Sequence, residues 1–121
     1  MEKREIILKN GNEYQFINET WERGYSWGHK TVLYKRGQTF PISQVKIRYY
    51  NRTWESYRYQ TCMRKAVETW KEEQENLYIE KYKEKNGIER FKKGEKQKVI
   101  DEFNNTDLAK EIEEIKNELK Y

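Results

Sequence analysis

The chain has 121 residues, of which 35% are hydrophobic and 38% are charged, so we expect one domain, or one small domain with a helical extension, around a small core. Ten Tyr, four Trp and four Phe supply much of that core and argue against disorder in residues 1–70. The formal net charge of +4 argues against a protein that imitates DNA, which should be strongly acidic.

The charge is unevenly distributed along the chain. Residues 1–66 contain 13 Lys or Arg and six acids, whereas residues 67–121 contain 12 Lys or Arg and 15 acids. A basic first half fits an ordinary solvated sheet, and it equally fits a face directed at an anionic partner. Both interpretations stay open from the sequence.

Four β-strands are predicted in the first half of the chain. Asn10-Gly11 is a strong signal for a two-residue hairpin turn between the first two strands. In the fourth strand, apolar side chains at alternate positions predict a buried face, while Lys46, Arg48 and Tyr50 point to the other side. We therefore expect an antiparallel meander whose strands span residues 5–9, 14–20, 29–36 and 44–50.

Between the second and third predicted strands, residues 21–28 read WERGYSWG, and we expect a loop there. Its glycines permit a tight turn that either packs Trp21, Tyr25 and Trp27 or displays them for binding. The segment matches no glycine pattern of a phosphate-binding loop.

The second half of the chain is predicted to be helical. A long helix should begin within residues 53–56, where Thr53 or Ser56 can cap its first turn, and end at Asn86-Gly87. A last helix should open at residues 105–107. The apolar stripe of the long helix comprises Tyr59, Cys62, Met63, Ala66, Val67 and Trp70.

We therefore predict an α+β fold: a small antiparallel sheet of three or four strands, packed by an amphipathic helix and followed by a charged helical C-terminal region. The expected division assigns residues 1–71 to the sheet and the start of the main helix. Residues 72–121 form the helical extension, and the sequence leaves open whether this extension packs on the sheet.

The sequence contains no recognisable catalytic or metal-binding pattern. One His and one Cys cannot supply the usual nitrogen and sulfur ligands of zinc, and no nucleophile motif surrounds His29. We expect His29 to be a surface or strand-end residue and Cys62 to be a buried packing residue. We accordingly predict a protein that is not an enzyme and has no cofactor, metal or small-molecule substrate.

Targeting signals are also missing from the sequence. The apolar run from Ile6 to Leu8 is too short for a signal peptide, and no run approaches the length of a membrane span. A single cysteine allows no disulfide within the chain, as expected in a reducing compartment. We expect a soluble, cytoplasmic protein without membrane contact.

The candidate partner-binding residues are aromatic and basic side chains, which favour protein and nucleic-acid partners alike. For the basic strand residues, a solvated outer sheet face is the simpler explanation, and it also stays open. The candidate residues are Trp21, Tyr25, Trp27, Lys46, Arg48, Tyr50, Arg52 and Arg58.

Residues 48–67 read RYYNRTWESYRYQTCMRKAV, and this segment resembles a pattern found in small proteins of phages and other mobile elements of Firmicutes. Within that group, the chain is similar to staphylococcal type II-A anti-CRISPR proteins. The resemblance implies a stoichiometric inhibitor of the host's type II RNA-guided CRISPR nuclease, acting in the bacterial cytoplasm. Such inhibitors block target-DNA binding or hold back a nuclease domain, and the near-neutral charge favours docking on that domain or on the nuclease–guide complex.

Three hypotheses follow for the function. The first is the nuclease inhibitor, with a weak contact to nucleic acid left open. The second is a small RNA- or single-strand-binding protein that uses the basic, aromatic face of the sheet. The third is a phage structural or assembly accessory protein whose C-terminal helices form the partner surface. Nucleic-acid binding should weaken steeply with salt, whereas an aromatic protein interface should be less sensitive to it.

Overall fold

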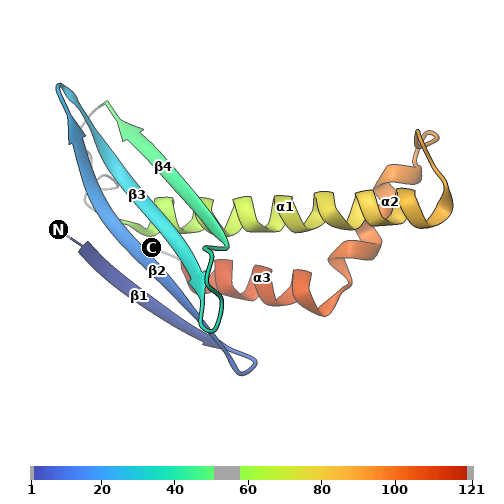
Figure 1. The fold of residues 1–121 in the computed structure, drawn as a ribbon, viewed down its shortest axis with the longest axis horizontal. Coiled ribbons are helices and arrows are strands. Elements are labelled where there is room, and N and C mark those ends of the chain that lie inside the picture. The colour runs from blue at the N-terminus through green and yellow to red at the C-terminus, as the bar shows by residue number, and fades with distance from the viewer. Residues whose placement is uncertain (1, 51–57, 120–121) are drawn as a thin grey trace.

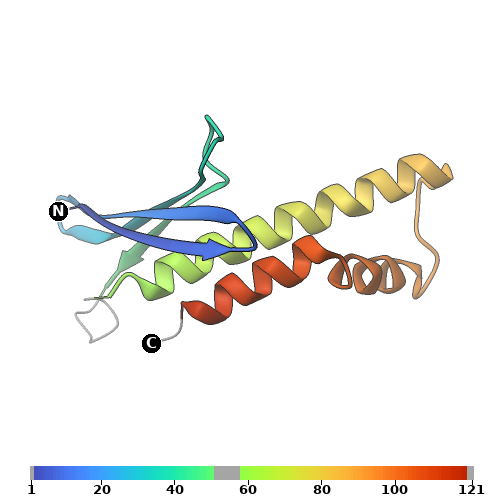
Figure 2. The same cartoon turned by 90° about the horizontal axis from the view of Figure 1, so that it is seen from below.

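The computed structural model describes residues 2–50 and 58–119 of the chain. Within these ranges the chain forms a four-stranded antiparallel sheet followed by three helices. The helices lie on the same side of the sheet (Figures 1 and 2). The predicted α+β fold is therefore confirmed.

The sheet is a meander in which each strand pairs with the next one along the chain. β1 (Glu2–Lys9) and β2 (Asn12–Arg23) are joined at Asn10 and Gly11, whose φ angles are 51° and 81°. Asparagine and glycine tolerate this left-handed conformation, so the predicted hairpin turn is confirmed. β3 (Ser26–Lys35) and β4 (Ser43–Tyr49) complete the order β1-β2-β3-β4.

The second hairpin corrects the prediction of a loop over residues 21–28. β2 continues to Arg23 and β3 begins at Ser26, so only Gly24 and Tyr25 form the turn. Gly24 has a φ of 62°, and this one glycine supplies the backbone conformation that the turn needs. The other residues of the segment pair as strands.

α1 (Gln60–Asn86) runs under the sheet and projects well beyond it (Figure 1). The helix as described begins at Gln60, with Tyr59 as its N-cap and no side-chain capping hydrogen bond. The predicted start in residues 53–56 lies outside the described residues. The helix ends as predicted, at Gly87, which has a left-handed φ of 63°.

α2 (Glu95–Asn104) and α3 (Asp107–Glu118) bring the chain back from the far end of α1 to the sheet (Figure 2). The Thr106 hydroxyl accepts a hydrogen bond from the backbone N–H of Ala109 at 3.3 Å. This contact caps α3, so the start predicted within residues 105–107 is confirmed.

One core joins the sheet to α1 and α3. The helical extension therefore packs on the sheet through α3. Side chains of α3 are buried in the same cluster as side chains of β1, β2, β3 and α1. Tyr59 packs at the edge of this cluster. The cluster contains Ile7, Tyr14, Phe16, Leu33, Met63, Ala66, Val67, Trp70, Ile112, Ile115 and Leu119.

A buried carboxylate fixes α3 to the first hairpin. Glu111 Oε2 accepts a hydrogen bond from the Tyr14 hydroxyl at 2.6 Å, and Oε1 accepts from the amides of Asn10 and Asn12 at 3.1 and 3.4 Å. Burial, together with the neighbouring carboxylate, raises the pKa of Tyr14. Because a buried charge is costly without such partners, these hydrogen bonds favour one position of α3 on the sheet.

Candidate functional site

The sheet has one face that no other part of the described chain covers. The helices pack on the opposite face, where Phe16 and Leu33 are cross-strand partners and fully buried. Because side chains alternate along a strand, Trp21, Lys46 and Arg48 point to the uncovered side. We call the uncovered side the open face and the opposite side the covered face.

Trp21 lies on the open face near the β2–β3 turn. Its indole Nε1 donates hydrogen bonds to the carbonyl oxygens of His29 at 3.3 Å and Ile47 at 3.2 Å, so the ring reaches from β2 across β3 to β4. Gly28 is its cross-strand partner. A Cβ atom at Gly28 would overlap the Ile47 carbonyl oxygen and lie 3.0 Å from Trp21 Cε2. This close approach requires glycine within the strand.

Basic side chains surround the indole. The Lys46 ammonium lies 4.3 Å from the centroid of the Trp21 ring, which is a cation–π contact. Arg23, Ser26 and Arg48 join these two residues in lining an open hollow of about 270 Å³. Among the described residues, no carboxylate lies within 4.0 Å of the three cations.

Lys30 extends this group on the same face. It is the cross-strand partner of Lys46 on one side and of Glu19 on the other, and within the described ranges it forms no ion pair. Sequence reasoning missed Arg23, because the assumed loop removed the strand alternation that reveals it. Lys30 lay in the predicted third strand, but the sequence does not give the register that pairs it with Lys46. We call Arg23, Lys30, Lys46 and Arg48 the basic cluster.

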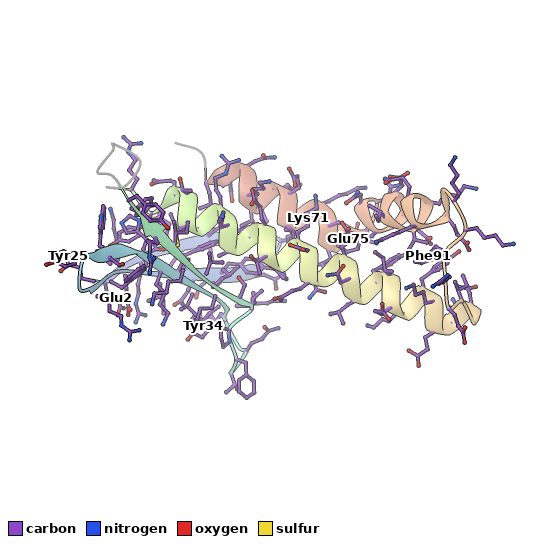
Figure 3. All side chains as sticks on the ribbon, turned by 90° about the horizontal axis from the view of Figure 1, so that it is seen from above. Glu2, Tyr25, Tyr34, Lys71, Glu75 and Phe91 are labelled. Carbon is purple, nitrogen blue, oxygen red and sulfur yellow. The ribbon has the colours of Figure 1, made fainter. Side chains whose placement is uncertain are left out.

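Two exposed tyrosines lie at the same end of the sheet. The exposed fractions of Tyr25 and Tyr50 are 108% and 84%, and Tyr25 lies at the extreme end of the sheet (Figure 3). Trp27 and Tyr49 are cross-strand partners, which places the β2–β3 turn beside the end of β4. The structure thus brings Tyr25 and Tyr50 near Trp21, Lys46 and Arg48.

Trp27 does not join this group. It lies on the covered face, partly buried, with its ring centroid 5.2 Å from Tyr49 and 6.1 Å from His29. The rings of Trp21 and Trp27 therefore lie on opposite faces of the sheet, although the sequence prediction grouped them in one loop. The reason is the strand alternation that continues through both residues.

His29 also differs from its prediction. It is 3% exposed and lies inside β3, with its ring centroid 4.3 Å from that of Tyr59, so the expectation of a surface or strand-end histidine was wrong. The hairpin extends β3 to Ser26, and aromatic rings then enclose the imidazole. Burial lowers the pKa of His29, against the opposite effect of a hydrogen bond to the backbone of Arg58.

Arg58 lies away from this group. Arg58 is exposed just before α1 and lines a separate hollow of about 220 Å³ with residues that include Lys3, Glu5 and Asn18. These strand residues belong to the covered face, so Arg58 is not next to Arg48. Arg52 lies outside the described residues.

Cys62 is a core residue of α1. Cys62 is fully buried, with its sulfur 3.8 Å from the Val45 carbonyl oxygen, and burial raises its thiol pKa. Its predicted packing role is confirmed. Across residues 2–50 and 58–119, no three His, Cys, Asp or Glu side chains group as metal ligands. Of the helices described, none has an apolar stretch long enough to cross a bilayer.

The open face offers the chemistry of noncovalent binding. The basic cluster supplies charge, the Trp21 indole holds one of the cations, and Tyr25 and Tyr50 supply rings and hydroxyl groups to a partner. No protein-family model, curated protein or solved structure matches the chain.

Proposed function

We propose that the protein is a stoichiometric inhibitor that docks the open face of its sheet on a type II RNA-guided nuclease and blocks cleavage of target DNA. The observation that carries this proposal is the hairpin end of the open face, where Trp21, Tyr25 and Tyr50 adjoin the basic cluster. The resemblance of residues 48–67 to staphylococcal type II-A anti-CRISPR proteins supports the choice of partner.

The side chains at this end are of the kinds that dominate protein interfaces. Tyrosine, tryptophan and arginine are enriched among residues whose truncation costs most binding free energy. Tyr25 and Tyr50 are exposed, and a tyrosine loses little side-chain entropy when a partner covers it. On the same face, but toward the opposite end of the sheet, Ile6 and Leu8 of β1 are 55% and 71% exposed.

The basic cluster supports an anionic partner surface. Among the described residues its cations form no ion pair within 4.0 Å, although Glu19 is the cross-strand partner of Lys30, so their charge is available to an acidic patch of a nuclease domain. Complementary charge raises the rate of association and fixes the orientation of the docked protein. The action on the nuclease needs no reaction by this chain: bound protein excludes either the target DNA or the movement of the cutting domain.

A cleavage assay tests the proposal. Purified staphylococcal type II nuclease, guide RNA and target duplex are mixed with equimolar or excess protein, and a gel shift follows target binding in the same mixtures. Loss of cutting with target binding retained supports docking on the nuclease domain, whereas loss of both supports a blocked DNA channel. Full cleavage by several such nucleases in excess protein would contradict the proposal.

A further inference from the structure

The basic cluster concentrates positive charge in a way that the fold itself does not require. Lys30 and Lys46 are direct cross-strand partners on β3 and β4, and Glu19 lies opposite Lys30 on β2. Like charges in the position of Lys30 and Lys46 destabilise a sheet. Arg48 follows Lys46 two positions along β4, about 7 Å away. No carboxylate of the described chain lies within 4.0 Å of any of the four cations. Departures of this kind from local design rules are typical of functional sites.

Part of the cluster is held in place before any partner arrives. The Trp21 indole is held by two hydrogen bonds to backbone carbonyls. The absence of a side chain at Gly28 leaves room for the ring. The Lys46 ammonium lies over this ring, 4.3 Å from its centroid. A cation that is already positioned loses less conformational freedom on binding an anion. Trp21 thus serves as a support for Lys46.

The exposed tyrosines add a second kind of contact beside the charges. Tyr25 and Tyr50 are both exposed, with exposed fractions of 108% and 84%. They flank the end of the sheet that carries Arg23 and Arg48, because the β2–β3 turn lies beside the end of β4. Aromatic rings next to a row of cations match the usual site for unpaired bases and their phosphates.

We propose that this end of the open face binds single-stranded nucleic acid. The basic cluster pairs with successive phosphates, and Tyr25 and Tyr50 stack on unpaired bases. The inference goes beyond the proposed function, in which the partner is a protein, and does not depend on it. The cluster spans only three adjacent strands, which are about 4.8 Å apart, so the binding is short, sequence-tolerant and sensitive to salt.

The shape of the surface favours a single strand over a duplex. The cluster lies on the face of the sheet, and its neighbours are a two-residue turn and a strand end. Reading a duplex requires an element that enters a groove, such as a helix or a β-ribbon. Stacking on Tyr25 and Tyr50 also requires bases that are not already paired.

Fluorescence anisotropy with a short labelled oligouridylate tests the inference on the full chain. For a single strand, each contacted phosphate contributes about −0.7 to the slope of log affinity against log salt. Four contacts therefore predict a slope of about −3. Absence of saturable binding at low salt would overturn the inference.

Matched charge variants locate the site. K46Q/R48Q should weaken binding about tenfold or more and make the slope about 1.4 less steep. K96Q/K98Q removes the same charge from exposed positions of α2 and should change neither quantity much. Equal effects of the two pairs would show non-specific attraction to a basic protein and overturn the assignment. Y25A/Y50A should weaken binding at least about fivefold, through lost stacking.

Competition experiments separate the possible ligands. A duplex of the same length and a polyglutamate of the same charge should each compete less well than the oligouridylate. Equal competition by the duplex, or by the peptide, would overturn the single-strand assignment.

Nuclease inhibition is scored separately. If the K46Q/R48Q variant no longer binds RNA but still inhibits the nuclease, the proposed function is left intact. RNA binding without any inhibition leaves the present inference intact and removes the proposed function.

Discussion

The Tyr14 hydroxyl donates a hydrogen bond of 2.6 Å to Glu111 Oε2, and this contact joins the second strand of the sheet to the last helix. The two residues are 1% and 8% exposed, so water competes little for either group. Because a hydrogen bond to a buried charge is stronger than one between neutral groups, the pair fixes α3 against the sheet.

Tyr14→Phe should lower the free energy of unfolding by about 1.5–3 kcal/mol, because it removes a hydrogen bond to a charged group and retains the ring. Urea unfolding followed by circular dichroism measures the change. Tyr34→Phe is the matched control: Tyr34 lies on the open face (Figure 3), and its change should stay within about 0.5 kcal/mol. Equal stability of the two variants would show that the Tyr14 contact contributes nothing.

Ile112→Ala should lower the free energy of unfolding by about 2–5 kcal/mol, because Ile112 is fully buried between α3 and the sheet and its loss leaves a cavity. Leu108→Ala, on the same helix but 38% exposed, should cost much less. Thermal unfolding followed by both tryptophan fluorescence and far-ultraviolet circular dichroism compares the variants. If the two signals gave clearly different melting temperatures for Ile112→Ala, the shared core would be contradicted.

His29 should make the protein less stable as the pH falls below about 6.5, the usual pKa of histidine. Burial lowers the pKa of His29 in the folded state, so in this window the unfolded chain binds more protons and stability rises with pH. The contribution is complete above the unfolded pKa and is lost as the pH falls through the folded pKa. The midpoint of urea unfolding, measured from pH 7.5 down to the pH at which carboxylates begin to titrate, reports the contribution of His29 to stability.

The control for this prediction uses the fact that the chain has one histidine. His29→Phe keeps an aromatic ring among Trp27, Tyr49 and Tyr59 but cannot titrate. Its stability should vary less with pH than that of the wild type in the same window. An unchanged pH dependence would assign the effect to other groups.

Gly28→Ala should lower the free energy of unfolding by about 1–3 kcal/mol, since the added methyl group meets the Ile47 carbonyl and the Trp21 ring. It should also shift the tryptophan fluorescence, because the indole is forced from its carbonyl partners. Ser26→Ala, on the same strand and the same face, should leave both properties nearly unchanged. A stable Gly28→Ala protein with native fluorescence would contradict the described support of Trp21.

Local signals in the sequence predicted much of the fold. The Asn10-Gly11 turn, the alternation in β4, the apolar stripe of α1 and the cap at Thr106 each depend on residues close together in the chain. The docking of α3 could not be predicted in this way. Tyr14 and Glu111 are 97 positions apart, and nothing in either local pattern connects them.

The candidate site was only partly predictable for the same reason. The residue types of Trp21, Lys46 and Arg48 indicated a binding surface, but their grouping depends on strand register. Residues 21–28 combine glycines with aromatic residues, which favoured a loop and concealed the pairing of Trp21 with Gly28. That error hid Arg23, and it grouped Trp21 and Trp27 in one loop although they lie on opposite faces of the sheet. Lys30 lay in the predicted third strand, and only the register that pairs it with Lys46 brings it to the site.

The most direct test of the open face as the docking surface is a titration of nuclease cleavage with three proteins. The wild type and Leu77→Ala, a change at an exposed position of the projecting part of α1, should inhibit at the same molar ratio. Tyr25→Ala with Tyr50→Ala should require at least about tenfold more protein, as expected for the loss of interface hot spots. Full inhibition by the tyrosine variant with loss of inhibition by Leu77→Ala would contradict the account and place the interface on the helices.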